Sequence, residues 1–248
     1  MKDTVASSPG SAPTQHLRAI PIVALDYPNR ESALRLVSLL GEDCRFYKVG
    51  SELFTAAGPE VVEEIRRQDC DVFLDLKLHD IPNTVAAAVR RIRSLGARLT
   101  TVHAAGGRAM MDAAVEAAGG DCGVFAVTVL TSLDRESFGE VIGAERADVE
   151  GTVMRLTGLA ASSGARGVVC SGDEAGPIRR RFGPALELLV PGVRLAGDAA
   201  GDQSRVTTPE AAVAAGADYL VLGRSVTGAI DPRAAMRAVL DRVSARAG

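Results

Sequence analysis

Three charged residues stand close together in an otherwise apolar run, FLDLKLHDIPNT, at positions 73–84. Asp75 and Lys77 are two positions apart in a predicted strand, so their side chains are expected to project from one face. Asp80 lies just beyond them, and the following Ile81-Pro82-Asn83-Thr84 predicts a rigid turn and a helix start that fixes where Asp80 points. An ammonium group among carboxylates stays ionised, which suits a site for an anionic ligand.

Lys48 is expected to join this group from the preceding predicted strand, RFYKVG at 45–50. Sequential strands of a barrel are neighbours, so the four charges should form an alternating row of Lys48, Asp75, Lys77 and Asp80. Each charge in such a row has an opposite neighbour that offsets its loss of water. The alternative is a structural salt bridge at the rim of a barrel, which an Asp-x-Lys pair alone would also fit.

The elements that must position these residues alternate between short apolar runs and helical patterns. Eight runs are predicted as strands, at 19–26, 45–50, 71–77, 98–104, 123–131, 167–171, 186–194 and 218–224. Helices are predicted at 29–40, 59–68, 83–95, 107–118, 149–163, 173–181, 209–215 and 232–246. Because parallel strands need helical crossovers, the pattern predicts an α/β fold, a (β/α)8 TIM barrel in a single domain over 17–248. An open doubly wound sheet is the alternative, although no GxGxxG follows the first run and no GxxxxGK occurs.

Polar residues follow or close nearly every predicted strand. They are Asp26, Lys48, Asp75 with Lys77, His103, Thr131 with Ser132, Ser171, Arg194, and Gly223 with Arg224. In a barrel these ends meet on one face, where active sites are built. A single polar residue could merely mark the start of a loop, but lysines and arginines are not turn formers. The set therefore favours a site for an anionic ligand.

Composition indicates a soluble globular protein of 248 residues, 47% hydrophobic and 24% charged. The net charge of −3 and the lack of a long basic block argue against nucleic-acid or membrane binding through a basic face. No run approaches the roughly 18 apolar residues of a membrane helix. Residues 1–16, rich in Ser, Pro, Ala and Gly without the apolar core of a signal peptide, are predicted to be a disordered tail.

The four cysteines are widely spaced, with no CxxC pair and no Cys/His cluster of zinc-ligand spacing; they are Cys44, Cys70, Cys122 and Cys170. Reduced, mostly buried thiols in a cytoplasmic protein are the simplest interpretation. We therefore expect no metal site and no nucleophilic cysteine. His79 is expected to pack or hydrogen-bond, and His103 either faces the site or supports the charged row.

The motif Asp75-x-Lys77-x-x-Asp80-Ile81-Pro82-Asn83-Thr84 resembles the signature of the orotidine 5′-phosphate decarboxylase family, in its bacterial type. Further segments resemble that family in the same order: VALD at 23–26, FYKVG at 46–50, TVHAAGG at 101–107, VTVLTS at 127–132, VPGVR at 190–194, AGDQ at 200–203 and GRSVT at 223–227. The resemblance covers roughly residues 17–246. It implies a dimeric barrel that converts orotidine 5′-phosphate to UMP and CO₂ without a cofactor.

The resemblance also implies roles for individual residues. Asp26 and Lys48 should hold the ribose, Asp75 should lie beside the substrate carboxylate, and Lys77 should protonate C6 of the pyrimidine. Asp80 should act across the dimer interface on the ribose of the neighbouring subunit. The remaining substrate-binding positions are Thr84, then Thr131 and Ser132 by the pyrimidine, and Arg194, Gln203, Gly223 and Arg224 at the 5′-phosphate. Phosphate binding is expected to close a loop at 196–205.

Two other functions remain open at this point. Sugar-phosphate enzymes of the same barrel superfamily share the Asp-x-Lys-x-x-Asp pattern, but they use Mg²⁺, and Lys48 would place positive charge beside Asp75. The other alternative is a catalytically inactive barrel that only binds nucleotides. The intact set of four charged residues argues against it.

Overall fold

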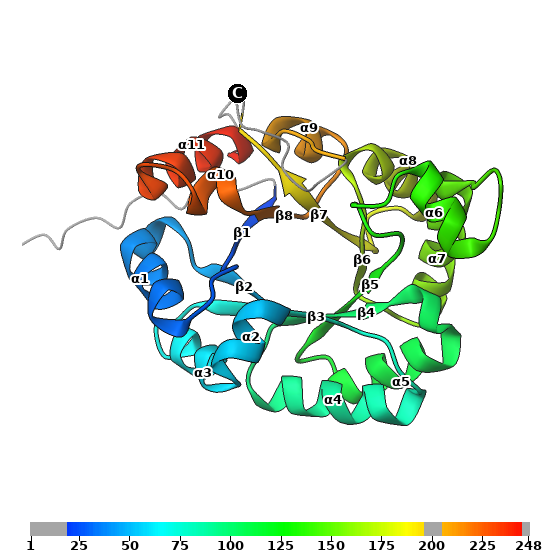
Figure 1. Ribbon diagram of the computed structural model, residues 1–248, viewed down its shortest axis with the longest axis horizontal. Helices are drawn as coiled ribbons and strands as arrows, with labels where there is room; N and C mark the ends of the chain where they lie inside the picture. Colours follow the sequence, from blue (N-terminus) through cyan, green and yellow to red (C-terminus); the bar gives the residue numbers. More distant parts are fainter. Residues whose placement is uncertain (1–18, 196–204, 245–248) are drawn as a thin grey trace, which may run out of the picture.

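The computed structural model describes residues 19–195 and 205–244. Eight parallel strands pair in sequence order, and β8 pairs with β1, so the sheet closes into a barrel. Figure 1 shows the strands as a ring, with the helices packed around its outside. The predicted (β/α)8 TIM barrel is confirmed. The predicted tail at 1–16 and the segment 196–204, which includes Gln203, lie outside the described residues.

All eight predicted strands are present, most of them shorter than predicted. They are β1 Ile20–Ala24, β2 Phe46–Gly50, β3 Asp71–Leu78, β4 Leu99–His103, β5 Gly123–Val127, β6 Gly167–Val169, β7 Glu187–Val193 and β8 Tyr219–Leu222. The largest difference is in β5, which ends at Val127, so Thr131 lies in the loop that follows and not in the strand. Some of the polar residues that were predicted at strand ends therefore lie in the loops that follow.

The helices that cover the barrel include all eight that were predicted. They are α1 Arg30–Leu40, α3 Glu60–Arg66, α4 Pro82–Ser94, α5 Arg108–Ala118, α7 Val149–Ser162, α8 Gly172–Phe182, α9 Pro209–Ala214 and α11 Pro232–Val243. Among the described residues, three short α-helices were missed, α2 Ser51–Ala57, α6 Arg135–Ile142 and α10 Arg224–Thr227, together with two 3-10 turns at Gly41–Asp43 and Ala104–Gly106. The start of α9 lies where the sequence predicted it. The Thr208 hydroxyl caps the helix by accepting a hydrogen bond from the Ala211 N–H, and Pro209 is the first helical residue.

The core has two layers, which follow from the alternation of side chains along each strand. One set of residues faces the helices, and the other fills the inside of the barrel. The inner set contains Phe46, Phe73, Leu99, Phe125 and Tyr219, and the Tyr219 ring packs edge-on against both Phe46 and Phe125. This apolar plug closes the middle of the barrel, so a ligand can enter only above or below it.

The amino ends of the strands are held by ion pairs. Asp71 at the start of β3 accepts from Arg66 at 3.0 Å and from Arg98. The Arg98 guanidinium also lies 5.5 Å from the centre of the Phe46 ring. Arg166 before β6 binds Glu187 of β7 at 2.7 Å. These charges join neighbouring strands at the end opposite to Lys77.

Candidate active site

A cavity of about 490 Å³ lies at the carboxyl ends of the strands. Nine of the predicted site residues line it: Asp26, Lys48, Asp75, Lys77, Thr131, Ser132, Arg194, Gly223 and Arg224. Apolar side chains of the barrel plug, among them Phe73 and Leu189, form part of its wall. The volume suits a small ligand, and the lining combines an apolar surface with a few polar groups, as ligand sites usually do.

Lys48 forms an ion pair with Asp26, at 2.7 Å between Nζ and Oδ1. The Lys48 side chain is only 12% exposed, whereas that of Asp26 is 57% exposed. In the structure the ion pairs join Lys48 to Asp26 and Lys77 to Asp75, so the expected row of alternating charges is present as two pairs on neighbouring strands. The register explains it: Ala24 pairs with Lys48, so Lys48 lies beside β1, just below Asp26.

Gly50 makes room for that ion pair. It faces Asp75 in the register of β2 and β3. A Cβ atom at Gly50 would lie 2.8 Å from Lys48 Nζ and 3.4 Å from Asp26 Oδ1. The glycine thus leaves the space that the Lys48 ammonium occupies beside Asp26.

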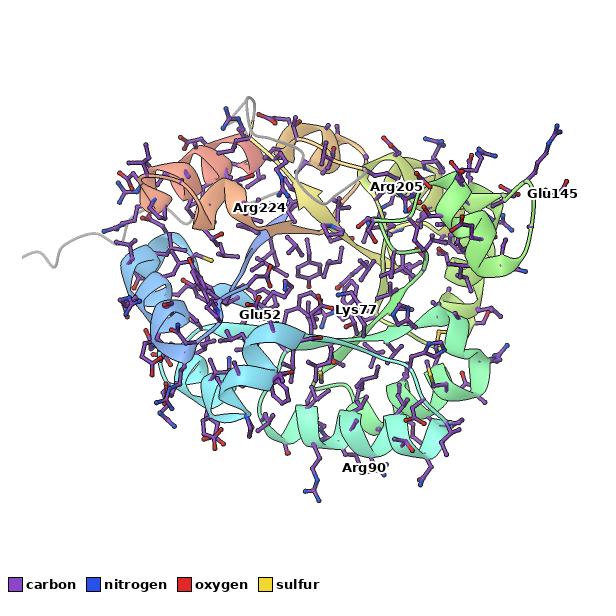
Figure 2. The ribbon with its side chains drawn as sticks, viewed as in Figure 1. Glu52, Lys77, Arg90, Glu145, Arg205 and Arg224 are labelled. Atoms are coloured by element: carbon purple, nitrogen blue, oxygen red, sulfur yellow. The ribbon has the colours of Figure 1, made fainter. Side chains whose placement is uncertain are left out.

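Asp75 and Lys77 form the second pair, at 2.7 Å between Oδ2 and Nζ. The Asp75 side chain is 10% exposed and that of Lys77 is 37% exposed. The prediction that the two side chains share a face is confirmed. Figure 2 shows Lys77 toward the centre of the ring of strands, whereas Arg90 of α4 points outward. A buried carboxylate thus holds an ammonium group at the edge of the cavity.

The strand is irregular where it carries this pair. The register of β3 and β4 joins Leu74 to Thr100 and Leu78 to Val102, so three residues of β3 face one residue of β4. Lys77 itself has φ +48°, in the left-handed region that side chains other than glycine disfavour. Nothing in the sequence marks this bulge, and bulges of this kind are used to re-aim side chains next to active sites.

The other side of the cavity is cationic. Arg194 follows β7, and Arg224 begins α10 directly after Gly223. Arg224 was predicted at the end of a strand, but it opens a helix of four residues. Of the charged side chains that line the cavity, four are cations, Lys48, Lys77, Arg194 and Arg224, and two are carboxylates, Asp26 and Asp75. This excess of positive charge favours an anionic ligand.

Asp80 and Thr84 do not line this cavity. Both are exposed, and the Asp80 carboxylate accepts a hydrogen bond from the Ile81 N–H at 2.7 Å, at the start of α4. Ile81 beside it is 67% exposed. Within one chain, therefore, the described residues bring Asp75 and Lys77 to the cavity and leave the third charge of the motif on the surface.

Two other polar residues near strand ends have local roles. Ser171 is the N-cap of α8, in a capping box with Glu174, and it is fully buried. His103 packs against His79, with 5.4 Å between ring centres. Burial lowers the pKa of His103, and electrostatic interactions with His79 and Lys77 lower it further, whereas Asp75 opposes them. Neither Ser171 nor His103 lines the cavity.

The four cysteines are free and buried, as predicted. Burial raises the pKa of both Cys44 and Cys122 to about 11. A thiol with so high a pKa is a poor nucleophile at neutral pH. Across the part of the chain that the structure describes, no three His, Cys, Asp or Glu side chains are grouped so that they could hold a metal ion.

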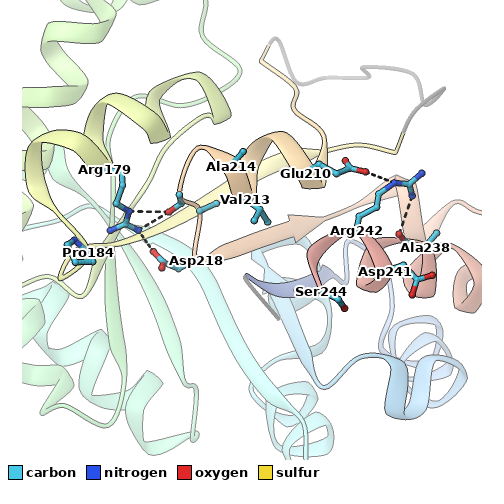
Figure 3. Close-up of a pocket in the computed structure, with 12 residues that line it drawn as sticks. Arg179, Pro184, Glu210, Val213, Ala214, Asp218, Ala238, Asp241, Arg242 and Ser244 are labelled. Atoms are coloured by element: carbon cyan, nitrogen blue, oxygen red, sulfur yellow. Dashed lines mark hydrogen bonds and ion pairs between the residues drawn. The ribbon is translucent and has the colours of Figure 1, made fainter. Parts of the chain in front are cut away.

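A larger groove, of about 1090 Å³, lies on the outside of the barrel near α9 and α11 (Figure 3). It reaches the amino end of β8, where Arg179 donates hydrogen bonds to the carbonyl of Gly216 and to Asp218. TIM barrels carry their active sites at the carboxyl ends of the strands, and conservation at the amino ends reflects stability. We therefore assign the smaller cavity, and not this groove, as the candidate active site.

Residues that sequence reasoning missed are mainly apolar or lie in loops. Pro191, Gly192 and Thr227 line the cavity without any polar or charged signal at a strand end. Thr101 lies behind it and contacts the Asp75–Lys77 pair. The VPGVR, GRSVT and TVHAAGG segments contain these positions, but nothing in their spacing singled them out.

The fold and the cavity together define a TIM-barrel protein with a lysine–aspartate pair at one side of its site and arginines at the other. Comparison with known proteins is more specific. Residues 20–239 match the model of the "Orotidine 5'-phosphate decarboxylase / HUMPS family", and the chain belongs to that family. Among the residues described, no helix is long and apolar enough to cross a membrane.

Similar proteins match over nearly their whole length. The orotidine 5′-phosphate decarboxylase of Halorhodospira halophila is 51% identical over 227 residues, which cover 90% of this chain and 95% of the relative. That of Thermobifida fusca is 51% identical over 223 residues, with 89% and 94% covered. The crystal structure of the Lactobacillus acidophilus enzyme superposes with a TM-score of 0.81 at 36% identity and covers 92% of this chain and 100% of that chain.

Proposed function

We propose that this protein decarboxylates orotidine 5′-phosphate to UMP and CO₂, the last step of pyrimidine nucleotide synthesis, without a cofactor. The observation that carries the proposal is the Asp75–Lys77 pair at the wall of a cavity whose opposite side presents Arg194 and Arg224. Relatives about half identical in sequence are named for this activity. The cavity is thus suited to a substrate with a reacting carboxylate at one end and a phosphate at the other.

The proposed reaction begins with the substrate carboxylate beside Asp75. The bond between C6 and the carboxylate breaks, CO₂ leaves, and the electron pair stays on C6. Lys77 Nζ, held 2.7 Å from Asp75, stabilises this negative charge and then transfers a proton to C6. The lysine is left neutral and regains its proton from solvent. Repulsion between Asp75 and the substrate carboxylate raises the energy of the bound substrate, which contributes to the rate.

The remaining residues bind the parts of the substrate that do not react. Asp26 and Lys48, which already form an ion pair, are proposed to hold the ribose hydroxyls. Thr131 and Ser132 are proposed to contact the pyrimidine. For the 5′-phosphate we propose Arg194, Gly223, Arg224 and Gln203, the last of which is outside the described residues. Binding energy at the phosphate can be used to hold the charged groups in place around C6.

We further propose a cytoplasmic homodimer in which Asp80 reaches the ribose in the site of the neighbouring subunit, with Thr84 also contributing to substrate binding. Asp80, Ile81 and Thr84 are all exposed, and none of them lines the cavity of its own chain. An exposed carboxylate beside a large exposed apolar residue suits a surface that a second subunit covers.

The experiment that tests the function is a turnover assay with purified protein, orotidine 5′-phosphate and EDTA. We expect the ultraviolet absorbance of the substrate to fall as UMP forms, at a rate proportional to protein concentration. Absence of turnover, or turnover that requires added Mg²⁺, would contradict the proposal. The second result would instead support a magnesium-dependent sugar-phosphate enzyme of the same family.

A further inference from the structure

Thr101 of β4 is a fully buried residue that contacts both members of the Asp75–Lys77 pair. Its hydroxyl accepts a hydrogen bond from the Lys77 backbone N–H at 2.9 Å. The same hydroxyl donates to Asp75 Oδ1 at 2.8 Å. A hydroxyl has one hydrogen and two lone pairs, so one orientation satisfies both bonds at once.

The bond to Lys77 compensates for the irregular strand. Asp75, Leu76 and Lys77 of β3 all face Thr101 alone, so the ladder between β3 and β4 is interrupted there. A buried backbone N–H without a partner is costly, and Thr101 Oγ1 supplies the partner. The left-handed φ of +48° at Lys77 persists only where its surroundings hold it. Thr101 is the side chain that holds this backbone from the neighbouring strand.

The hydrogen bond from the Thr101 hydroxyl means that the two oxygens of the Asp75 carboxylate accept from two different donors. Oδ1 accepts from Thr101 and Oδ2 accepts from Lys77 Nζ, at 2.8 and 2.7 Å. With one oxygen held from β4, the carboxylate cannot rotate about its χ2 angle without losing a bond. The oxygen that faces Lys77 is thereby fixed in direction.

We propose that Thr101 is a positioning residue for the reaction: its hydroxyl fixes the backbone that aims Lys77 and the carboxylate that holds the lysine ammonium. It does not line the cavity, and it acts through the two charged residues. The inference rests on the proposed function, because it assigns Lys77 as the proton donor. Its consequence is that loss of the hydroxyl should affect the chemical step and not the binding of the nucleotide.

The test is Thr101→Val, which keeps the shape of the side chain and removes the hydroxyl. We expect kcat to fall about 10- to 100-fold, because misplacement of a reacting group by about 1 Å can cost about 100-fold. The affinity for UMP, measured by calorimetry, should stay within about threefold, because the phosphate and ribose groups are untouched. Thr101→Ser, which restores the hydroxyl, should recover most of kcat.

Thr100→Val is the matched control. Thr100 is also fully buried on β4, and its hydroxyl also bonds to β3, but it donates to the Leu74 carbonyl at 3.0 Å and not to the charged pair. Both valine variants should lower the melting temperature, whereas only Thr101→Val should lower kcat. An unchanged kcat in Thr101→Val, or an equal loss in Thr100→Val, would overturn the proposal.

A further variant and the wild-type control separate a folding defect and a wrong functional assignment from the role of the Thr101 hydroxyl. If Thr101→Val does not fold, Thr101→Cys takes its place, because its S–H is a weak donor; cysteine should then lower kcat and serine should not. Equal loss in both would reject the role of the hydroxyl. Wild-type protein that fails to turn over orotidine 5′-phosphate would reject the proposed function itself, which is a different result from any of these.

Discussion

The two ends of the barrel interior both carry charged side chains, but they arrange them differently. At the amino end Asp71 is bonded to both Arg66 and Arg98, and Arg98 also covers the Phe46 ring. At the carboxyl end the charges surround a cavity of about 490 Å³, and the cations that line it outnumber the carboxylates. A smaller pocket at the amino end, of about 360 Å³, is lined by three carboxylates, Glu42, Asp43 and Asp71, and by two cations, Arg45 and Arg98. The cavity at the carboxyl end has the opposite excess, which an anionic ligand can balance.

The comparison shows how the same residue types serve two purposes in one fold. An ion pair at the amino end joins adjacent strands and has water on its outer side, so its contribution to stability is small. The Asp75–Lys77 pair at the carboxyl end is more buried than the Asp71–Arg98 pair and lines the proposed substrate cavity, so its effect on a reaction can be large. Substitutions at the two ends should therefore separate catalysis from stability.

The largest effect is expected for Lys77→Ala, which removes the proton donor and leaves buried Asp75 without its ammonium partner. Proton transfer and charge stabilisation are lost together, so kcat should fall at least about 10⁴-fold. Steady-state kinetics and a melting curve would measure the change. A folded Lys77→Ala protein with activity near that of the wild type would place the chemistry elsewhere in the molecule.

The next effect tests whether one chain contains the whole carboxyl-end site. Lys77→Ala and Asp80→Ala proteins should each be nearly inactive, but after subunit exchange a random mixture of dimers should contain about a quarter of its sites intact. Native mass spectrometry would verify the exchange, and the turnover assay would measure the recovery. Without recovery after verified exchange, Asp80 would have to act in the site of its own chain.

A smaller effect is expected for Gly50→Ala. The added Cβ would lie 2.8 Å from Lys48 Nζ, so the ammonium must move away from Asp26. Lys48 has a long side chain that can shift, and we therefore expect a folded protein whose KM rises about tenfold, or about 1.4 kcal/mol of lost binding. Gly158→Ala is the control, because its Cβ would meet only the Phe182 ring at 3.9 Å. Equal KM values for the two variants would contradict a role for Gly50 in placing Lys48.

The smallest effect is expected at the amino end, for Arg98→Ala. The variant loses the bonds to Asp71 and the contact with the Phe46 ring, but Asp71 keeps Arg66. The free energy of unfolding should decrease by about 1 kcal/mol, with kcat unchanged. Urea denaturation and the turnover assay would measure both. A fall in kcat comparable to that of Gly50→Ala would show that the two ends are not independent.

The sequence predicted the barrel well, because strands buried on both faces are near-continuous apolar runs and the helices between them have clear caps. It also predicted the contact of Asp75 with Lys77, since side chains two apart on a strand share a face. The family resemblance added the functional assignment, which neither composition nor spacing could supply.

Three features could not be predicted, and each depends on geometry between strands. The partner of Lys48 depends on the register of β1 and β2, and a list of strand ends does not contain that register. The bulge at Lys77 has no glycine or proline to mark it. Thr101 stands in an apolar strand as an ordinary β-branched residue, and only the bulge gives its hydroxyl two partners.

The irregularity in β3 also separates the part of the strand needed for folding from the part that carries the charged pair. The register resumes at Leu78, so the two residues that the bulge adds leave the later side chains on their original faces. Deletion of one residue there would turn Leu78 and the start of α4 to the wrong side, whereas deletion of Leu76 and Lys77 together would restore a regular ladder. We therefore expect a barrel that lacks Leu76 and Lys77 to fold and to be inactive, because the two added residues are needed for the charged pair and not for strand pairing.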